Sequence, residues 1–484
     1  MKKFISVYLL SLSILLNLSF AGRLDPRLVA AIRATPGIGA AGERQLPVII
    51  KLKKQIDPSS IRAGLAQNRG VPEANIDNGT IFKELERQTA TFRINLDVVL
   101  QSFERQGFIA SPKSFWIVNA VALKASPEIL QGIADLPEVE VVALDEPRNF
   151  LPNPIRRPAA GDGNVENWGI AHIRADVAHK QNFTGAGVKV CIIDSGIDLD
   201  HPAFAPGQIL AKESKSFVPN EDLNDGIGHG THCAGVVASS QFGVAPDAKV
   251  VAIKVLDSQG MGTTRAVVEG IEHVVKSGGY LVNMSLGGQA MPGFDDPVDI
   301  AVTNSEKGGV FFSIAAGNEG PRAGTIGSPG VVSSALTVAA TGRRRNIADF
   351  SSRGPTVNGD AKPDVGAPGI KIPSASKDGT IEEMDGTSMA APHALGLAAL
   401  LYGKWFSIYN EALRKEGKPR MTALPPPQLI KKIIMETADG PAKVNVYGAG
   451  IINCEAALAA PFVTPGAQFR PFRALQNWIR RNFG

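Results

Sequence analysis

Residues 188–193, VKVCII, decide the fold of the longer part of this chain. The run is short and almost wholly apolar, which is typical of a strand buried on both faces of a sheet. Similar runs follow at 249–256, 280–285, 310–315 and 335–340, with helical patterns at 263–278 and 297–308. This alternation predicts an α/β fold with a mostly parallel sheet and helices on both faces. Ligand sites of such folds lie at the carboxyl ends of the strands.

A smaller α+β unit precedes this region, at residues 46–145. Its strand patterns occur at 46–53, 114–125 and 139–144, and its helical patterns at 59–67, 80–106 and 126–136. Their order fits the split βαβ arrangement of a ferredoxin-like domain. A Pro- and Gly-rich linker follows, so the predicted division of the chain is 1–21, 46–145, a linker at 146–166, 167–460 and a tail at 461–484.

Two stretches near the end of the main region differ in character. Residues 389–402 are almost wholly apolar, which predicts a helix buried all round. The polar and then Pro-rich stretch at 404–427 predicts a surface insertion.

The two ends of the chain differ in composition from the regions between them. A basic start, an apolar run to about Leu18 and small residues up to Ala21 predict a signal peptide at 1–21, hence a secreted product, extracellular or periplasmic. The alternative is a membrane anchor, which needs about 20 apolar residues. No transmembrane anchor is expected elsewhere. The tail has four arginines and no acid at 469–484. It predicts a helix docked on the body, with contact with an anionic membrane surface as the alternative.

Composition narrows the function class. The 484 residues are 44% hydrophobic and 20% charged, and 50 basic residues against 46 acidic ones give a net charge of +4. The composition is that of a globular protein, and the nearly even charge gives no reason to expect a nucleic-acid partner. Three cysteines, Cys191, Cys233 and Cys454, allow at most one disulfide and form no CxxC pair. They are expected to be small buried apolar residues.

Polar residues with catalytic potential follow several of the predicted strands. Asp194 directly follows the run at 188–193, where an acid is common and by itself says little. His229 and His232 lie three positions apart among glycines. On a helix they can share a face and bind zinc, or one of them can act as a general base. The residues alone leave both interpretations open.

Two further residues are candidates for acyl-transfer chemistry. Asn318, in AAGNEG, is either a turn residue or an amide that holds an oxyanion. Ser388, in DGTSMAAPHALG (385–396), lies where the buried helix begins. There it is either a helix cap or a hydroxyl beside free backbone N–H groups.

The order Asp194, His229, Asn318, Ser388 resembles that of the subtilisin-like serine proteases. The matching motifs, which span Trp168 to about Ala459, are IIDSGID, GHGTHCAG, NMSLGG, AAGNEG and GTSMAAPH. The resemblance implies a serine endopeptidase in which Ser388 is the nucleophile, His229 the general base and Asp194 the group that orients it. Asn318 and the Ser388 N–H would hold the oxyanion.

The same resemblance extends to neighbouring residues. His232 would be structural, and HGTHCAG is similar to the proteinase K branch, in which the cysteine here numbered Cys233 is a buried thiol. The peptide substrate would be held by strand addition and enter a pocket with small walls, which implies broad specificity with an apolar preference. The implied substrate-binding residues are Gly260, Met261, Gly262, Ser285, Leu286, Gly287, Ala315, Ala316 and Gly317, with Glu319 near the rim.

The unit at 46–145 resembles the inhibitory propeptide of this family, an intramolecular inhibitor that assists folding. Self-cleavage would fall in the linker, although Arg156-Arg157 is an alternative target for another protease. No cofactor or catalytic metal is implied. The short loop at 236–247 and the arginines at 340–346 depart from known calcium sites, so a weak calcium site is left open but not predicted. The rival functions are a catalytically silent peptide-binding relative and a zinc hydrolase.

Overall fold

The computed structural model describes residues 23–34, 44–71, 73, 76–151, 155–158, 167–290, 296–415 and 424–462. The predicted signal peptide at 1–21 and the tail helix at 469–484 lie outside them. The chain divides into two compact units. The N-terminal unit takes in the chain up to Gln55, Ala90–Ser114 and Asn119–Glu146, and the main unit takes in Ile56–Thr89, Phe115–Val118 and the chain from Pro147 onward.

The N-terminal unit is built on one five-stranded sheet, in the order β1-β5-β2-β4-β3. The strands are β1 (Arg23–Leu24), β2 (Leu46–Leu52), β3 (Ile109–Phe115), β4 (Ala120–Ala125) and β5 (Val139–Leu144), and the helices are α1 (Pro26–Ala34), α4 (Ile94–Arg105) and α5 (Pro127–Ala134). Leu96 of α4 and Ile133 of α5 pack in one core with Val48 of β2. The order β5-β2-β4-β3 confirms the ferredoxin-like prediction. The sequence patterns did not predict β1, which pairs in parallel with β5.

Two predicted elements of this region are wrong in extent. The helix predicted at 80–106 is two helices, α3 (Asn78–Phe92) and α4, which are separated at Arg93. The strand predicted at 114–125 is interrupted by a turn at 116–119 between β3 and β4. Glu272 and Asn304, distant in the sequence, bond to the backbone of Trp116 and Ile117, so Asn119 is the one turn-forming residue that the local sequence offers. Helix α2 (Pro58–Arg69) extends the predicted helix at 59–67.

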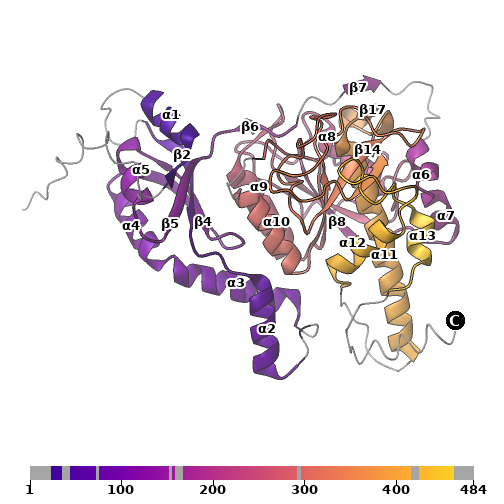
Figure 1. The fold of residues 1–484 in the computed structure, drawn as a ribbon, viewed down its shortest axis with the longest axis horizontal. Coiled ribbons are helices and arrows are strands. Elements are labelled where there is room, and N and C mark those ends of the chain that lie inside the picture. The colour runs from indigo at the N-terminus through magenta and orange to yellow at the C-terminus, as the bar shows by residue number, and fades with distance from the viewer. Residues whose placement is uncertain are drawn as a thin grey trace, which may run out of the picture. The chain divides into compact units, whose positions relative to one another are not determined.

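The main unit contains a seven-stranded sheet in the order β15-β14-β13-β12-β8-β10-β9, and every pair in it is parallel. Figure 1 shows strands of this sheet as arrows among the helices of the unit. Its strands are β8 (Lys189–Asp194), β9 (Lys215–Ser216), β10 (Lys249–Lys254), β12 (Leu281–Met284), β13 (Phe311–Ala315), β14 (Leu336–Thr341) and β15 (Val365–Pro368). The main helices are α8 (His229–Ala238), α9 (Thr264–Lys276), α10 (Pro297–Lys307) and α11 (Thr387–Lys415). This confirms the predicted α/β class.

Helices cover both faces of this sheet. Val190 and Ile192 of β8 share a core with α8 and α11. On the other face, Gly270 of α9 lies against Ile253 and Ile193. The strand order places β8 between β10 and β12. After β8 the chain forms β9 and β10 on one side of it and then crosses to β12 on the other side. Such a switch point opens a crevice at the carboxyl ends of the strands.

Smaller elements complete the main unit. The short helices are α6 (Trp168–His172), α7 (Ala175–Lys180), α12 (Pro427–Glu436) and α13 (Cys454–Ala459), with a 3-10 turn at Lys377–Gly379. Two small antiparallel sheets join β6 (Arg148–Asn149) to β11 (Met261–Gly262), and β7 (Ile155–Pro158) and β16 (Ile372–Ala375) to β17 (Ile381–Asp385).

Helix α11 is longer than the sequence predicted. It continues to Lys415, so the first part of the insertion predicted at 404–427 is helix. The helix continues because it still has a packing partner: Trp405 is buried and meets the ring of Phe462 edge-on at 5.3 Å.

Two early segments of the chain pack on α9 and α10 of the main unit. Glu272 of α9 accepts hydrogen bonds from the backbone N–H groups of Trp116 (2.6 Å) and Ile117 (3.1 Å). Asn304 of α10 donates to the carbonyl of Ile117 at 2.8 Å. Near the end of α10, the ring of Phe82 from α3 lies against Gly308.

Two sequence predictions about the chain as a whole can be compared with the described residues. The three cysteines are free and buried, as predicted. Within the described ranges, none of the helices combines the length and the apolar character needed to cross a bilayer.

Candidate active site

Asp194 and His229 meet at the carboxyl end of the central strand. Asp194 is the last residue of β8, and His229 is the first residue of α8, which follows Gly228 in the left-handed conformation. His229 Nδ1 lies 2.7 Å from Asp194 Oδ1, and both side chains are fully buried. With Nδ1–H donating to the carboxylate, the neutral ring keeps Nε2 free to accept a proton.

Electrostatics at this pair favour the protonated imidazole. Burial lowers the pKa of His229, but the charge and hydrogen bond of Asp194 outweigh it, so the pKa lies well above its usual range. Cys233 Sγ lies 3.9 Å from His229 Nδ1, and its S–H donates to the carbonyl of Ser388. Burial raises the pKa of this thiol. The thiol is therefore neutral, and Asp194 is the anion that acts on the ring.

Asp225 joins the strand that ends in Asp194 to the helix that begins with His229, and sequence reasoning missed it. Its Oδ1 accepts from Ser195 Oγ and Gly228 N, both at 2.8 Å. Its Oδ2 accepts from the N–H (2.8 Å) and hydroxyl (2.7 Å) of Thr231. Asp225 thus ties the end of β8 to the first turn of α8. An acid four residues before His229, at a helix N-terminus, was the available signal.

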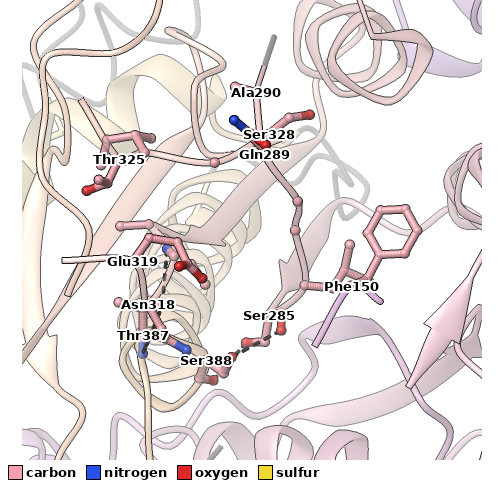
Figure 2. A pocket seen from close by; sticks show the side chains of 18 of the residues that line it. Phe150, Ser285, Gln289, Ala290, Asn318, Glu319, Thr325, Ser328, Thr387 and Ser388 are labelled. Atoms are coloured by element: carbon pink, nitrogen blue, oxygen red, sulfur yellow. Dashed lines mark hydrogen bonds between the residues drawn. The ribbon is translucent and has the colours of Figure 1, made fainter. Parts of the chain in front are cut away.

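Ser388 enters the site from the first turn of α11. It is mostly buried, and its hydroxyl donates to the carbonyl of Ser285 at 3.2 Å (Figure 2). The first N–H groups of a helix have no partner within the helix and carry its positive dipole end. Here the N–H of Thr387 donates to Asn318 and that of Met389 to the carbonyl of Gly386, so a negatively charged oxygen beside Ser388 would meet the N–H of Ser388 itself.

Asn318 lies beside the same helix start. Its Oδ1 accepts from Thr387 N (3.0 Å) and Thr387 Oγ1 (2.9 Å), as Figure 2 shows. An amide oxygen held by two donors fixes the whole group, which leaves the NH2 group free on the other side. Thr387 Oγ1 in turn accepts from Gly317 N at 3.2 Å. The structure thus places a fixed amide donor near Ser388.

A cavity of about 650 Å³ opens in front of Asn318 and Ser388 (Figure 2). Residues named from the sequence line much of it: Ser285, Leu286, Gly287, Ala315, Ala316, Gly317 and Glu319. Sequence reasoning missed the loop Gly324–Ser328 and the side chains of Gln289, Ala290 and Val357. The glycines of the loop were a usable signal, because glycine allows a backbone to approach a ligand closely.

The chain itself occupies the groove beside this cavity. β6 pairs with β11, so that Asn149 lies opposite Met261 and Arg148 opposite Gly262. Phe150 N donates to Gly260 O at 3.3 Å, and Phe150 O accepts from Gly287 N at 3.0 Å. The extended segment therefore lies between the two stretches that the sequence assigned to peptide binding.

His232 takes no part in the arrangement around His229. Its Nε2 donates to the carbonyls of Ile372 (3.0 Å) and Glu382 (3.1 Å). Burial lowers the pKa of His232 to about 3, so the ring is neutral. Among the described residues, the cluster of potential metal ligands is Asp194, His229 and Cys233. The paired-histidine zinc site considered from the sequence is not formed there.

Comparisons with known proteins agree on one family. The profile of the subtilase family matches residues 185–450. M-protease of Shouchella clausii (strain KSM-K16) is 32% identical over 369 residues, which cover 75% of this chain and 85% of that protein. Subtilisin Savinase of Lederbergia lenta is 36% identical over 296 residues, 60% of this chain and 97% of that protein. The solved structure of a cold adapted subtilisin-like serine proteinase is 33% identical, covers 56% of this chain and 89% of its own, and has a TM-score of 0.46.

The family profile covers more than half of the chain, and the first of these relatives is matched over most of its length. The chain belongs to the subtilase family and is a subtilisin-like serine protease.

Proposed function

We propose that this serine endopeptidase is made as a secreted zymogen that cuts its own linker. The observation that carries the proposal is the path of the linker at residues 148–158, whose two described parts bind to elements that surround Ser388. Residues 148–151 lie in the groove beside the cavity, with Phe150 bonded to both groove walls. Residues 155–158 pair with β17, which ends at Asp385, three positions before Ser388. We expect the cleaved bond between Leu151 and Ile155.

The proposed reaction uses the four residues that the sequence pointed to. Neutral His229, oriented by Asp194, removes the proton of Ser388 as its oxygen attacks the substrate carbonyl. The hydroxyl must first leave its bond to Ser285 O. The NH2 group of Asn318 and the Ser388 N–H hold the oxyanion, and His229 then protonates the leaving amine to give the acyl-enzyme. No metal or cofactor enters this scheme.

The walls of the cavity support the proposed specificity. Ala315, Ala316 and Gly317 leave room for a large apolar side chain, and Glu319 lies at the lining. The flanking backbone, Gly260–Gly262 on one side and Ser285–Gly287 on the other, binds an extended peptide of any sequence. Broad specificity with an apolar preference is the expected result.

The remaining parts of the chain have proposed roles in maturation. We assign 1–21 as a signal for export to the periplasm or the medium, and 46–145 as the propeptide that inhibits and assists folding. The contacts of Glu272 and Asn304 with the turn at 116–119 support the propeptide role. The tail at 461–484 is proposed to dock on the body, with membrane-surface contact as the alternative. The buried Cys233 beside His229 supports the proteinase K branch.

Replacing Ser388 by Ala tests the proposal. The variant should neither release the propeptide nor hydrolyse casein, whereas Ser407→Ala, an exposed position on the same helix, should behave as the wild type. N-terminal sequencing and intact mass of the secreted wild-type product should place the cut between Leu151 and Ile155. Normal processing of Ser388→Ala would show that another enzyme cuts the linker. Loss of activity with a chelator, but not with a serine-directed reagent, would instead favour the zinc hydrolase.

A further inference from the structure

An ion pair joins the linker to β17, the strand that ends three residues before Ser388. Strand β7 of the linker pairs with β17 in antiparallel register, with Ile155 opposite Asp385 and Arg157 opposite Glu383. The guanidinium of Arg157 reaches diagonally to Asp385, with Nη1–Oδ1 at 2.9 Å and Nη2–Oδ2 at 3.0 Å. Asp385 is 7% exposed. This bidentate contact takes both oxygens of a buried carboxylate.

We propose that Asp385 forms a subsite for a basic residue, arginine above all, on the leaving-group side of the cleaved bond. The inference rests on the proposed function, because it treats the linker as a substrate bound to its own enzyme. Arg157 would lie several residues past the cut. A substrate with arginine at the same position would make the same contact.

The surroundings of Asp385 favour a cationic occupant over an empty site. Lys371 N donates to Oδ1 of Asp385 at 2.7 Å. Besides Arg157, this neutral backbone N–H is the donor that the described residues supply to the carboxylate. After the cut, Arg157 stays on the mature chain, and when this new N-terminal segment moves off β17, water reaches the remaining lone pairs of Asp385. A substrate strand that takes its place covers the carboxylate again. A covered carboxylate without a cationic partner is costly, so a substrate that brings a cation is favoured over a substrate that does not.

Geometry distinguishes this site from a general attraction for basic peptides. The planar fork of arginine matches both carboxylate oxygens, whereas lysine offers a point charge. The adjacent Arg156 has a different environment: its side chain donates to the carbonyl of Ile227 and lies 3.8 Å from Glu382. Glu382 also accepts from Ser376 at 2.9 Å. Arg156 therefore serves as the matched control for Arg157.

Competition by short peptides tests the subsite whether or not the peptides are cut. The enzyme is purified after expression of the full chain, and its hydrolysis of labelled casein is inhibited by a peptide that copies residues 147–161. We expect the inhibition constant to rise about fivefold with Arg157→Gln in the peptide and less with Arg157→Lys, a modest value because Arg157 is 36% exposed. Arg156→Gln should have a smaller effect than Arg157→Gln.

A variant enzyme assigns the effect to Asp385. With Asp385→Asn, the parent and Arg157→Gln peptides should inhibit equally. Asp439→Asn, which breaks a surface pair with Arg345 (3.1 Å), should keep the fivefold ratio. Equal inhibition by the two peptides in the wild type, no inhibition by either, or a ratio that survives Asp385→Asn would each overturn the subsite. Failure of the wild type to hydrolyse casein would instead overturn the proposed function.

Discussion

At the scale of single residues, the site depends on hydrogen bonds that fix polar groups before a substrate arrives. Asn318 is the clearest case, because Thr387 holds its oxygen and thereby aims its NH2 group. Asn318→Ala should lower kcat by about 10²- to 10³-fold with little change in KM, a magnitude known for the oxyanion asparagine of subtilisin. Steady-state kinetics on a peptide substrate measure both constants.

A second variant separates the two functions of the Asn318 amide, the NH2 group as hydrogen-bond donor to the oxyanion and the oxygen as acceptor for Thr387. Asn318→Asp keeps an acceptor for Thr387 but loses the NH2 group, so it should be as impaired as Asn318→Ala. If Asn318→Asp retained wild-type kcat, the residue would act as a structural anchor of the helix start and not as an oxyanion donor.

In the proposed reaction, the pair of Asp194 and His229 sets the pH dependence. The base must be neutral, and Asp194 holds the pKa of His229 well above its usual range. Activity should therefore rise with pH as His229 loses its proton, and the midpoint of this rise, the acidic limb of the pH profile, should lie above the usual range of a histidine pKa. In Asp194→Asn, burial is left to lower the pKa of His229, so the limb should move to lower pH while kcat falls by about 10⁴-fold. The pH profile of kcat/KM measures both changes, and an unmoved limb would contradict the role of Asp194.

The sequence predicted which residues gather at the candidate site, but not the residues that hold them in place. Asp194, His229, Asn318 and Ser388 stand in motifs with fixed spacing, so the sequence named the residues that the structure brings to one edge of the sheet. Asp225 was missed because an isolated acid in a loop has many uses. Phe150 was missed because its position in the groove depends on a pairing across more than a hundred residues with β11.

At the scale of elements, the errors occur where distant partners decide the local structure. The helix predicted at 80–106 has buried positions Leu85, Thr89, Leu96 and Leu100, which keep one helical phase across the break at Arg93. Periodicity therefore contains no signal for the break. The turn at 116–119 is apolar except for Asn119 and lacks glycine and proline, and Glu272 and Asn304 bond to the backbone of Trp116 and Ile117 from far along the chain.

The contact of α9 with this turn gives an element-scale prediction. Glu272→Ala leaves the N–H groups of Trp116 and Ile117 without their buried carboxylate, at a cost of about 1–3 kcal/mol per unsatisfied group. We expect the full-length chain to mature more slowly and in lower yield. A pulse-chase measurement of propeptide release follows this directly.

A matched variant on the same helix makes the test specific. Glu269→Gln changes a charge one turn away, on α9, and should leave the rate of propeptide release unchanged. Equal slowing by Glu269→Gln and Glu272→Ala would indicate a general effect on α9. An unchanged rate in Glu272→Ala would show that the contact with the turn does not contribute to maturation.

At the scale of the whole molecule, two lysine side chains bind a pair of oxygen ligands, the carboxylate of Asp364 and the carbonyl of Ala335, that could otherwise hold a metal ion. The Asp364 carboxylate meets Lys362 Nζ at 2.6 Å and Lys431 Nζ at 3.1 Å. Both ammonium groups also donate to the carbonyl of Ala335, at 2.7 and 2.8 Å. A carboxylate and a carbonyl are the ligands that calcium prefers, but here two fixed positive charges already occupy them. Binding a further cation beside them would be repulsive.

We therefore expect no calcium to bind at Asp364. Because the sequence also predicts no specific calcium site, we expect calcium to add little to the stability of the molecule. A metal site saturated at one hundred times its Kd would add about 2.7 kcal/mol to the free energy of unfolding and raise Tm by several degrees. The inactive Ser388→Ala chain avoids self-digestion during the measurement, and its Tm should agree within about 1 °C in EDTA and in millimolar calcium. A rise of several degrees on adding calcium would reveal a site that the paired lysines do not replace, and loss of that rise after substitution of a candidate carboxylate would locate it.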